Sequence, residues 1–199
     1  ALFWLARYTR LGRGVPRDPV RALELYLRAA KEGSVRAKTT AAQMLITGDE
    51  VRKDLSRGEA LLREAGDAGD APALTILGQY LEAGSFGTRY PSEARRLYRQ
   101  AAEANDPGGM FYLGRVVAQG IGGPQSVEEG TVWLRRAAEA SFAPAMFALA
   151  QACESGVATG GASEARRWYS AAAESGHVPA QQALAALAPA RTKREPVIV

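Results

Sequence analysis

The sequence contains a single histidine and a single cysteine, two side chain types that often carry acid–base or nucleophilic chemistry. His177 lies at a predicted turn, and catalysis would need a carboxylate or a nucleophile held beside it. We identify no such partner and expect His177 to be a solvated turn residue. Cys153 occupies a position at which apolar residues recur every 36 residues, namely Leu45, Leu81 and Val117. We therefore expect a buried, unreactive core cysteine.

The abundant glycines do not form a phosphate-binding loop. The pattern GxxxxGK followed by Ser or Thr is absent, and Gly120-Ile121-Gly122-Gly123 connects two predicted helices rather than a strand and a helix. Glycines at such places supply the left-handed backbone of turns. No set of His, Cys or carboxylate residues has metal-ligand spacing either. The sequence therefore predicts no cofactor, no metal site and a protein that is not an enzyme.

Arginines could instead form a basic track for nucleic acid or an acidic polysaccharide. Three of them recur at the 36-residue step: Arg63, Arg99 and Arg135. Each is followed four residues later by a carboxylate: Asp67, Glu103 and Glu139. Such pairs on a helix stabilise it by about 0.2–0.5 kcal/mol each, so we expect a self-neutralised, solvated outer face. Exposed aromatic residues are not interleaved with these arginines, and the sequence argues against nucleic-acid binding.

Composition indicates a folded chain. Of its 199 residues, 47% are hydrophobic and 23% charged, with a net charge of +4. A single cysteine cannot form an intramolecular disulfide. No apolar run is long enough to predict a transmembrane segment, and the first residues lack the pattern of a signal peptide. Because the sequence begins at Ala1 rather than Met, we expect a processed or truncated parent.

Internal repetition organises the whole sequence. Five glycines are 36 residues apart: Gly12, Gly48, Gly84, Gly120 and Gly156. The same step links Tyr26, Leu62, Tyr98 and Leu134, with Tyr169 following after 35 residues. A second set of turn-forming residues marks the end of each unit: Gly33, Gly69, Asn105, Ser141 and Gly176. A fixed period of this length is typical of a solenoid.

Each unit is predicted to contain two helices. The first carries a small residue and, four positions later, a Leu-Gly pair or a substitute, as in Ala73 with Leu77-Gly78. The second carries a small residue, an aromatic residue or leucine, and an alanine pair on one stripe. N-cap residues are expected at Asp18, Asp54 and Ser126. Helices this short are marginal alone, so each unit must bury its apolar face against its neighbour.

These motifs resemble those of the Sel1-like repeat, a relative of the tetratricopeptide repeat. The resemblance rests on Gly12–Asp18 (GRGVPRD), followed by Ala22, Tyr26 and Ala29-Ala30. It implies an all-α, right-handed α-solenoid of helix–turn–helix repeats. The second unit departs most from the family pattern, with Ala41-Ala42 in place of Leu-Gly and Gly58 in place of alanine.

The resemblance covers residues 1–187 as a single solenoid domain. We expect five repeats and a closing helix: 1–33, 34–69, 70–105, 106–141, 142–176 and 177–187. Residues 188–199 lack a helical stripe, and we expect a flexible tail.

The resemblance also implies a non-enzymatic scaffold that binds other proteins through its concave wall. In tetratricopeptide repeats, residues two before and two after the Leu-Gly leucine point into that wall. The positions that we expect to contact a partner are Thr75, Gln79, Phe111, Arg115, Phe147 and Gln151. Packing of Phe111 and Phe147 between neighbouring helices is the alternative role for those two residues.

Family members suggest a bacterial source, with the periplasm or cell envelope favoured over the cytoplasm. An alternative function is an accessory part of an envelope exopolysaccharide secretion machine that contacts an anionic polymer through arginine.

Overall fold

The computed structural model describes residues 1–187, which form eleven α-helices and no strand. The helices are α1 (Leu2–Leu11), α2 (Pro19–Lys31), α3 (Val35–Thr47), α4 (Leu55–Asp67), α5 (Ala71–Ala83), α6 (Pro91–Glu103), α7 (Pro107–Gln119), α8 (Val127–Glu139), α9 (Ala143–Glu154), α10 (Gly161–Glu174) and α11 (Val178–Leu187). The predicted all-α fold is confirmed, and the predicted tail, 188–199, lies outside the described residues.

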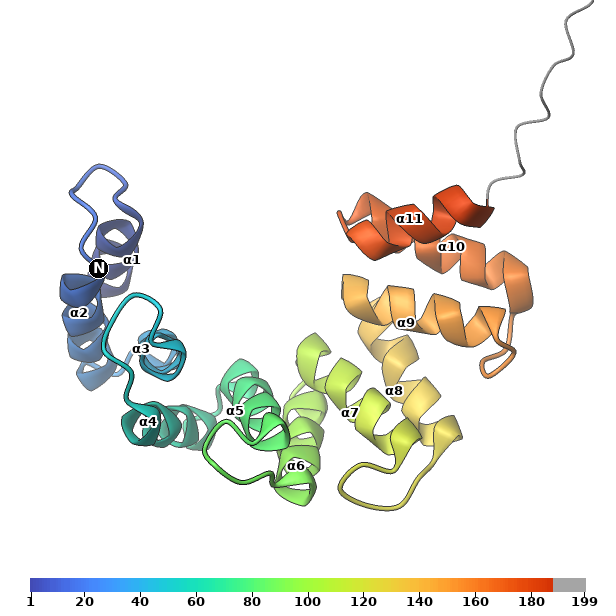
Figure 1. The fold of residues 1–199 in the computed structure, drawn as a ribbon, viewed down its shortest axis with the longest axis horizontal. Helices are drawn as coiled ribbons and strands as arrows, with labels where there is room; N and C mark the ends of the chain where they lie inside the picture. The colour runs from blue at the N-terminus through green and yellow to red at the C-terminus, as the bar shows by residue number, and fades with distance from the viewer. Residues whose placement is uncertain (188–199) are drawn as a thin grey trace, which may run out of the picture.

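The helices form an α-solenoid. Each helix packs chiefly against the helices that precede and follow it in sequence. Figure 1 shows the resulting curved row, in which α3, α5 and α7 lie on the inner side of the bend while α4 and α6 lie on the outer side. The first helices of successive units therefore build an inner wall. Within residues 1–187, no helix is both long and apolar enough to span a bilayer.

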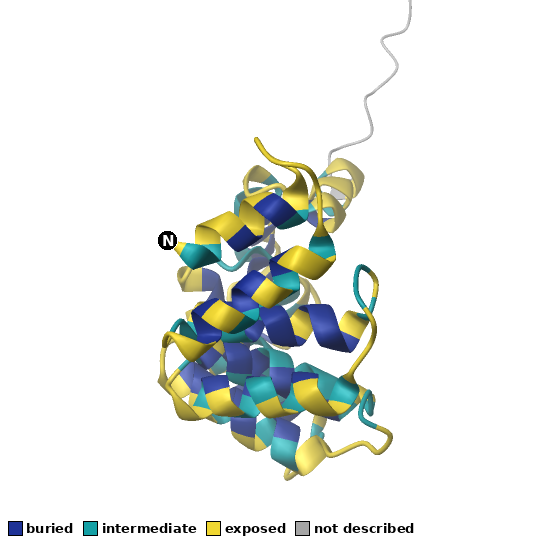
Figure 2. Cartoon of the chain, turned by 90° about the vertical axis from the view of Figure 1, so that its left-hand side faces the viewer, coloured by how far each residue is buried: buried dark blue, intermediate teal, exposed yellow. Residues whose placement is uncertain are grey.

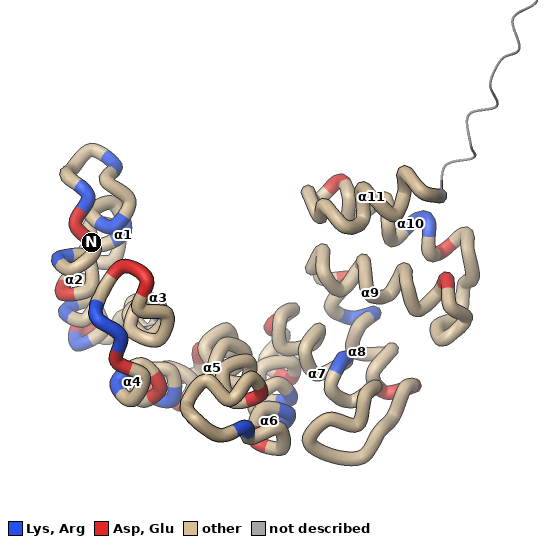
Figure 3. Tube along the Cα trace, viewed as in Figure 1, with Lys and Arg blue, Asp and Glu red and all other residues tan. Residues whose placement is uncertain are grey.

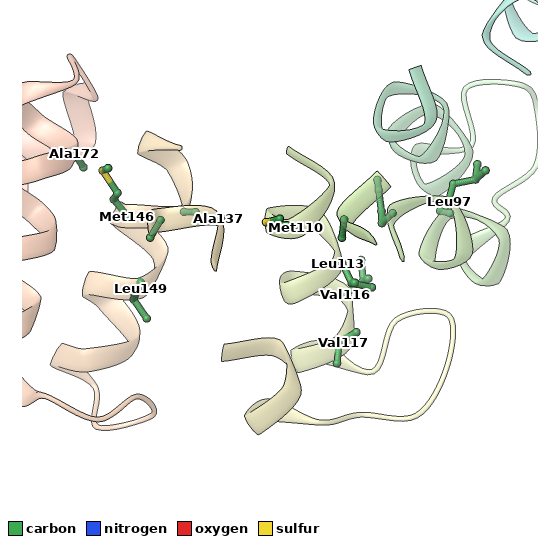
Figure 4. Close-up of a cluster of buried hydrophobic side chains, with 14 of the residues drawn as sticks. Leu97, Met110, Leu113, Val116, Val117, Ala137, Met146, Leu149 and Ala172 are labelled. Atoms are coloured by element: carbon green, nitrogen blue, oxygen red, sulfur yellow. The ribbon is translucent and has the colours of Figure 1, made fainter. Parts of the chain in front are cut away.

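The core consists of two clusters of buried apolar side chains, one within α1–α3 and one that runs as a seam through the units from α3 to α11. Leucines at the same place in three units are almost completely buried, since Leu77, Leu113 and Leu149 are exposed by 1%, 0% and 0%. Figure 4 shows Leu113 on α7 and Leu149 on α9 within this seam. Figure 2 shows exposed residues along the outward faces of helices seen from the side on which α1 lies. This pattern is the nearest-neighbour burial expected of a repeat array.

Small residues allow the two helices of a unit to approach closely. A Cβ atom added at Gly78 would lie 2.6 Å from Cε1 of Tyr98, so the Leu-Gly glycine makes room for the tyrosine ring. In the second unit, a Cβ atom at Gly58 would lie 2.5 Å from Cγ1 of Ile46. The departure at Gly58 is thus matched to the bulk of Ile46 on the facing helix.

The turns and caps follow the predicted register. All five unit-end residues have positive φ angles, including the two that are not glycine, Asn105 (62°) and Ser141 (63°). The predicted N-cap side chains of Asp18, Asp54 and Ser126 each accept a hydrogen bond from the backbone N–H three residues later. These contacts satisfy donors that a helix leaves without an internal partner.

Candidate partner-binding surface on the inner wall

The first row of predicted wall residues lies at the joints between units. The Thr75 hydroxyl donates to Oδ2 of Asp106 at 2.7 Å, and that carboxylate lies immediately before α7. Thr39 makes the equivalent bond to Asp70. Thr75 is only 5% exposed, so its side chain connects two units and contributes little accessible surface.

Two aromatic residues occupy the same repeat position in later units. The rings of Phe111 and Phe142 are centred 5.6 Å apart, and those of Phe147 and His177 are centred 5.0 Å apart. Phe142 and His177 each lie just before the first helix of the next unit. Phe111 and Phe147 are both half-buried. They therefore join neighbouring units and leave part of each side chain accessible on the wall.

The structure corrects the expectation that His177 is solvated. Its ring packs against Phe147, and within the described part of the chain its Nδ1 atom is buried without a hydrogen-bond partner. The sequence placed His177 correctly after a unit end. What it could not show is that the next helix turns this side chain back onto the preceding unit.

The second row borders a hollow of about 600 Å³ between α5 and α7. Gln79 and Arg115 line it together with Glu82, Tyr98 and Tyr112. Nη2 of Arg115 donates to Oε2 of Glu82 at 2.6 Å, and the Tyr98 hydroxyl donates to the same oxygen at 3.0 Å. The Tyr98 ring stacks on Tyr112 with centroids 5.3 Å apart. The predicted pair Gln79 and Arg115 is thus brought together, whereas Gln151 lies on α9 and is exposed.

Sequence reasoning missed Glu82, Tyr98 and Tyr112 as parts of this hollow, although an alternation in the repeats marks two of them. Units with a tyrosine on the second helix have a polar residue at the facing position of the first helix, the pairs being Tyr26 with Arg10, Tyr98 with Glu82 and Tyr169 with Glu154. Units with leucine have Ile46 or Ala118 there. A buried hydroxyl needs a hydrogen-bond partner, and a leucine does not.

The buried tyrosines are held as hydrogen-bond donors. Burial, together with the neighbouring Glu82, raises the pKa of Tyr98 well above its usual value. Burial and the 2.8 Å hydrogen bond to Glu154 raise the pKa of Tyr169 to about 12. Both hydroxyls therefore stay protonated at neutral pH and fix the wall carboxylates in place.

Cys153 lies in the core of the solenoid. Cys153 is 1% exposed, and burial raises the pKa of its thiol. The predicted core position is confirmed. Residues 1–187 contain no group of three or more His, Cys, Asp or Glu side chains arranged to hold a metal ion. The side chains described on the wall can bind a ligand by hydrogen bonds, charge and aromatic contact.

The outer arginine row is neutralised, but by partners other than those predicted. Arg63, Arg99 and Arg135 form ion pairs with glutamates on the second helix of the next unit, at 2.7, 2.8 and 2.5 Å. Those glutamates are Glu93, Glu129 and Glu164. The sequence expectation of pairing with Asp67, Glu103 and Glu139 was therefore wrong. Figure 3 likewise shows basic and acidic positions intermixed along α2 and α4. This row gives no support to the alternative of an anionic-polymer track.

Comparison with solved structures identifies proteins of the same architecture. A Sel1 repeat protein from Oxalobacter formigenes aligns with a TM-score of 0.84 and 25% identity, covering 94% of this chain and 76% of the other. A protective antigen of uropathogenic Escherichia coli with an SLR fold aligns with a TM-score of 0.63 and 23% identity, covering 94% and 48%. The immunity protein PA5088 from Pseudomonas aeruginosa aligns with a TM-score of 0.65 and 21% identity, covering 90% and 67%.

The sequence matches a family model but no curated protein. A search of curated proteins finds no match to this chain. The family model for the Sel1 repeat matches residues 1–34, 41–70, 71–106, 107–142 and 143–177. These five segments correspond to the successive helical pairs of the solenoid. The chain therefore belongs to the Sel1 repeat family.

Proposed function

We propose that this protein is a non-enzymatic scaffold that binds other proteins through the inner wall of its solenoid. The observation that carries the proposal is the hollow lined by Gln79, Arg115 and Tyr112 between α5 and α7, two helices on the inner side of the bend (Figure 1). Tyrosine and arginine are among the side chains that most often dominate protein–protein binding.

The construction of the wall supports this role. Arg115 and Tyr98 both bind Glu82, so the polar groups of the hollow are fixed before a partner arrives. Preorganised side chains lose little conformational entropy on binding. Phe111 on α7 and Phe147 on α9 are half-buried, and both add apolar surface. Similarity to the Oxalobacter formigenes protein favours a bacterial source.

The proposal is tested by affinity capture from the native organism with matched variants. One variant changes two wall amides, Gln79→Ala with Gln151→Ala, because neither side chain is fully buried. The control changes two exposed amides elsewhere, Gln100→Ala with Gln125→Ala. We expect a partner that wild type and the control retain and that the wall variant loses by about tenfold or more.

Circular dichroism should show equal helix content in all three proteins. A partner lost equally from both variants, or from neither, would contradict binding at the wall.

A further inference from the structure

A second hollow lies on the inner wall between α1 and α3, two units before the one described above. It encloses about 320 Å³ and is lined by Phe3, Arg7, Arg10, Leu11, Tyr26, Arg36 and Thr40. Five of these residues occupy the repeat positions of residues that line the hollow between α5 and α7, the pairs being Arg7 and Gln79, Arg10 and Glu82, Leu11 and Ala83, Tyr26 and Tyr98, and Thr40 and Tyr112. The same place in the repeat thus forms a hollow twice.

The two hollows differ in charge. Between α5 and α7, Glu82 supplies a carboxylate that binds Arg115 at 2.6 Å. Between α1 and α3, the equivalent position is Arg10, and the lining contains three guanidinium groups and no carboxylate. The first unit therefore supplies a positive charge where the third unit supplies a negative one.

Only one of the three guanidinium groups is neutralised. Arg10 binds Glu50 at 2.5 Å, and Glu50 also binds Arg17. Among the described residues, Arg7 and Arg36 form no ion pair. Each guanidinium instead stacks on an aromatic ring, Arg7 over Trp4 at 5.3 Å and Arg36 over Phe3 at 5.2 Å. Stacking on a ring orients a guanidinium while leaving its N–H donors available.

Three positive charges and one negative charge act on the Tyr26 hydroxyl. Burial raises the pKa of this hydroxyl, the charges of Arg10, Arg7 and Arg36 act to lower it, and the charge of Glu50 acts to raise it. Because Glu50 is already paired with Arg10 and Arg17, the charges of Arg7 and Arg36 remain to attract an anion in the hollow.

We propose that this hollow binds a carboxylate from an acidic segment of the partner protein, with Arg7 and Arg36 donating to it. Phe3, Tyr26 and Leu11 provide apolar surface for a neighbouring side chain of the same segment. Arginine suits this task because its planar fork matches the two oxygens of a carboxylate. The inference rests on the proposed function and adds the chemistry of the bound segment.

The test measures binding of a defined peptide to the full chain. The probe has six residues, with adjacent glutamate and aspartate between two leucines, and is made both as a free acid and as a C-terminal amide. A matched peptide carries glutamine and asparagine instead. Dissociation constants come from ¹⁵N NMR titrations of wild type, of Arg7→Gln with Arg36→Gln, and of the control Arg96→Gln with Arg136→Gln.

The control removes the same charge from exposed arginines on α6 and α8. The substitution at Arg7 copies Gln79, the residue at that position in the third unit.

We expect the acidic peptides to bind wild type and the control alike, and the hollow variant at least about tenfold more weakly. Stronger binding of the free acid than of the amide would assign the carboxylate to a chain end, and equal binding would assign it to side chains. Equal binding of the neutral peptide, or an unchanged dissociation constant in the hollow variant, would overturn the proposal. So would binding of a hyaluronate oligosaccharide in preference to the peptides.

The experiments distinguish failure of the proposed function from failure of this inference. If the Gln79 and Gln151 variant retains every captured partner, the wall is not the binding face, whatever the peptide titration gives. If that variant loses its partner while the Arg7 and Arg36 variant binds the acidic peptide normally, only the assignment of this hollow is wrong.

Discussion

At the level of single residues, the turns between units depend on backbone conformation more than on side-chain type. The five unit-end positions share a positive φ angle, and three of them are glycine. Asn tolerates this left-handed conformation better than most residues, whereas Ser gains little from it. Ser141 is therefore the unit end at which the chain retains the most avoidable strain.

Replacing Ser141 with glycine should stabilise the protein. The left-handed conformation costs an L-residue about 1–2 kcal/mol, and glycine avoids this cost. Part of the resulting gain in stability is lost because glycine increases the conformational entropy of the unfolded chain. We expect Ser141→Gly to raise the free energy of unfolding by about 0.5–1 kcal/mol, as measured by urea denaturation.

Ser175 provides the matched control. It also ends a second helix and is exposed, but its φ angle is −76°. Ser175→Gly should therefore lower stability slightly. A gain in both variants, or in neither, would show that the φ angle is not the deciding factor.

Residue-scale features that depend on one unit alone were predictable from the sequence. The N-caps at Asp18, Asp54 and Ser126 and the core position of Cys153 are set by neighbours within a few residues or by the repeat itself. The surroundings of His177 were not, because Phe147 lies thirty positions earlier and meets it only when two units dock.

At the level of the helix, burial follows from whether a neighbouring hairpin covers a given face. Leu77 and Leu5 occupy the same repeat position two units apart, yet Leu77 is 1% exposed and Leu5 is 45% exposed. α5 packs against α4 of the preceding unit, whereas none of the helices described in residues 1–187 lies before α1.

This pair of leucines gives a prediction with an internal control. Leu77→Ala should lower the free energy of unfolding by about 2–5 kcal/mol, because it removes buried methyl groups and leaves a cavity. In a protein made of residues 1–199, where Leu5 is 45% exposed, Leu5→Ala should lower it by less than about 1 kcal/mol. Urea denaturation of both variants measures the difference. Similar losses at the two positions would mean that the seam between units is not the core.

The second helices are joined by the outer ion pairs, and these make stability depend on pH. The hydrogen bond from Arg99 lowers the pKa of Glu129 below its usual value of 4.5, and the hydrogen bond from Arg135 does the same for Glu164. A carboxyl group with a lowered folded-state pKa stabilises the fold above its unfolded pKa. That contribution is lost as the pH falls through the folded-state pKa.

Removing both carboxylates should therefore flatten the acid limb of the stability curve. We expect Glu129→Gln with Glu164→Gln to lower stability at neutral pH by about 0.2–1 kcal/mol per pair, since both pairs are partly exposed. Between about pH 5 and pH 3, this variant should lose less stability than wild type. Thermal unfolding across that pH range provides the measurement.

The control uses the carboxylates that lie four residues after the same arginines. Glu103→Gln with Glu139→Gln removes the same charge, and neither group forms an ion pair among the described residues. Its acid limb should follow that of wild type. If this control flattens the limb and the Glu129 and Glu164 variant does not, the pairing between units is wrong.

The wrong partners for the arginines show what helix-scale reasoning leaves out. Spacing within one helix correctly places Glu103 near Arg99, but it carries no information on how the next unit is rotated. In the structure, Arg99 on α6 donates to Glu129 on α8 of the next unit. The period predicts which residues recur, whereas contacts between units depend on the packing angle of neighbouring hairpins.

At the level of the whole molecule, repetition turns one helical hairpin into a curved wall (Figure 1). The predicted solenoid follows from the 36-residue period because each apolar face needs a neighbour. The wall residues followed only in part. The hollow between α5 and α7 joins Gln79 and Arg115 as expected, but Glu82 and Tyr98 complete it through contacts that cross the hairpin.

The central claim, that partners bind the inner wall, is tested most directly by site-specific photo-crosslinking. A benzophenone amino acid is placed singly at Gln79, Gln151 or Gln100, and each protein is irradiated in an extract of the native organism. We predict one protein crosslinked from both Gln79 and Gln151 and not from Gln100, which lies on α6. Crosslinks to that protein from Gln100 alone, or equally from all three positions, would contradict the account.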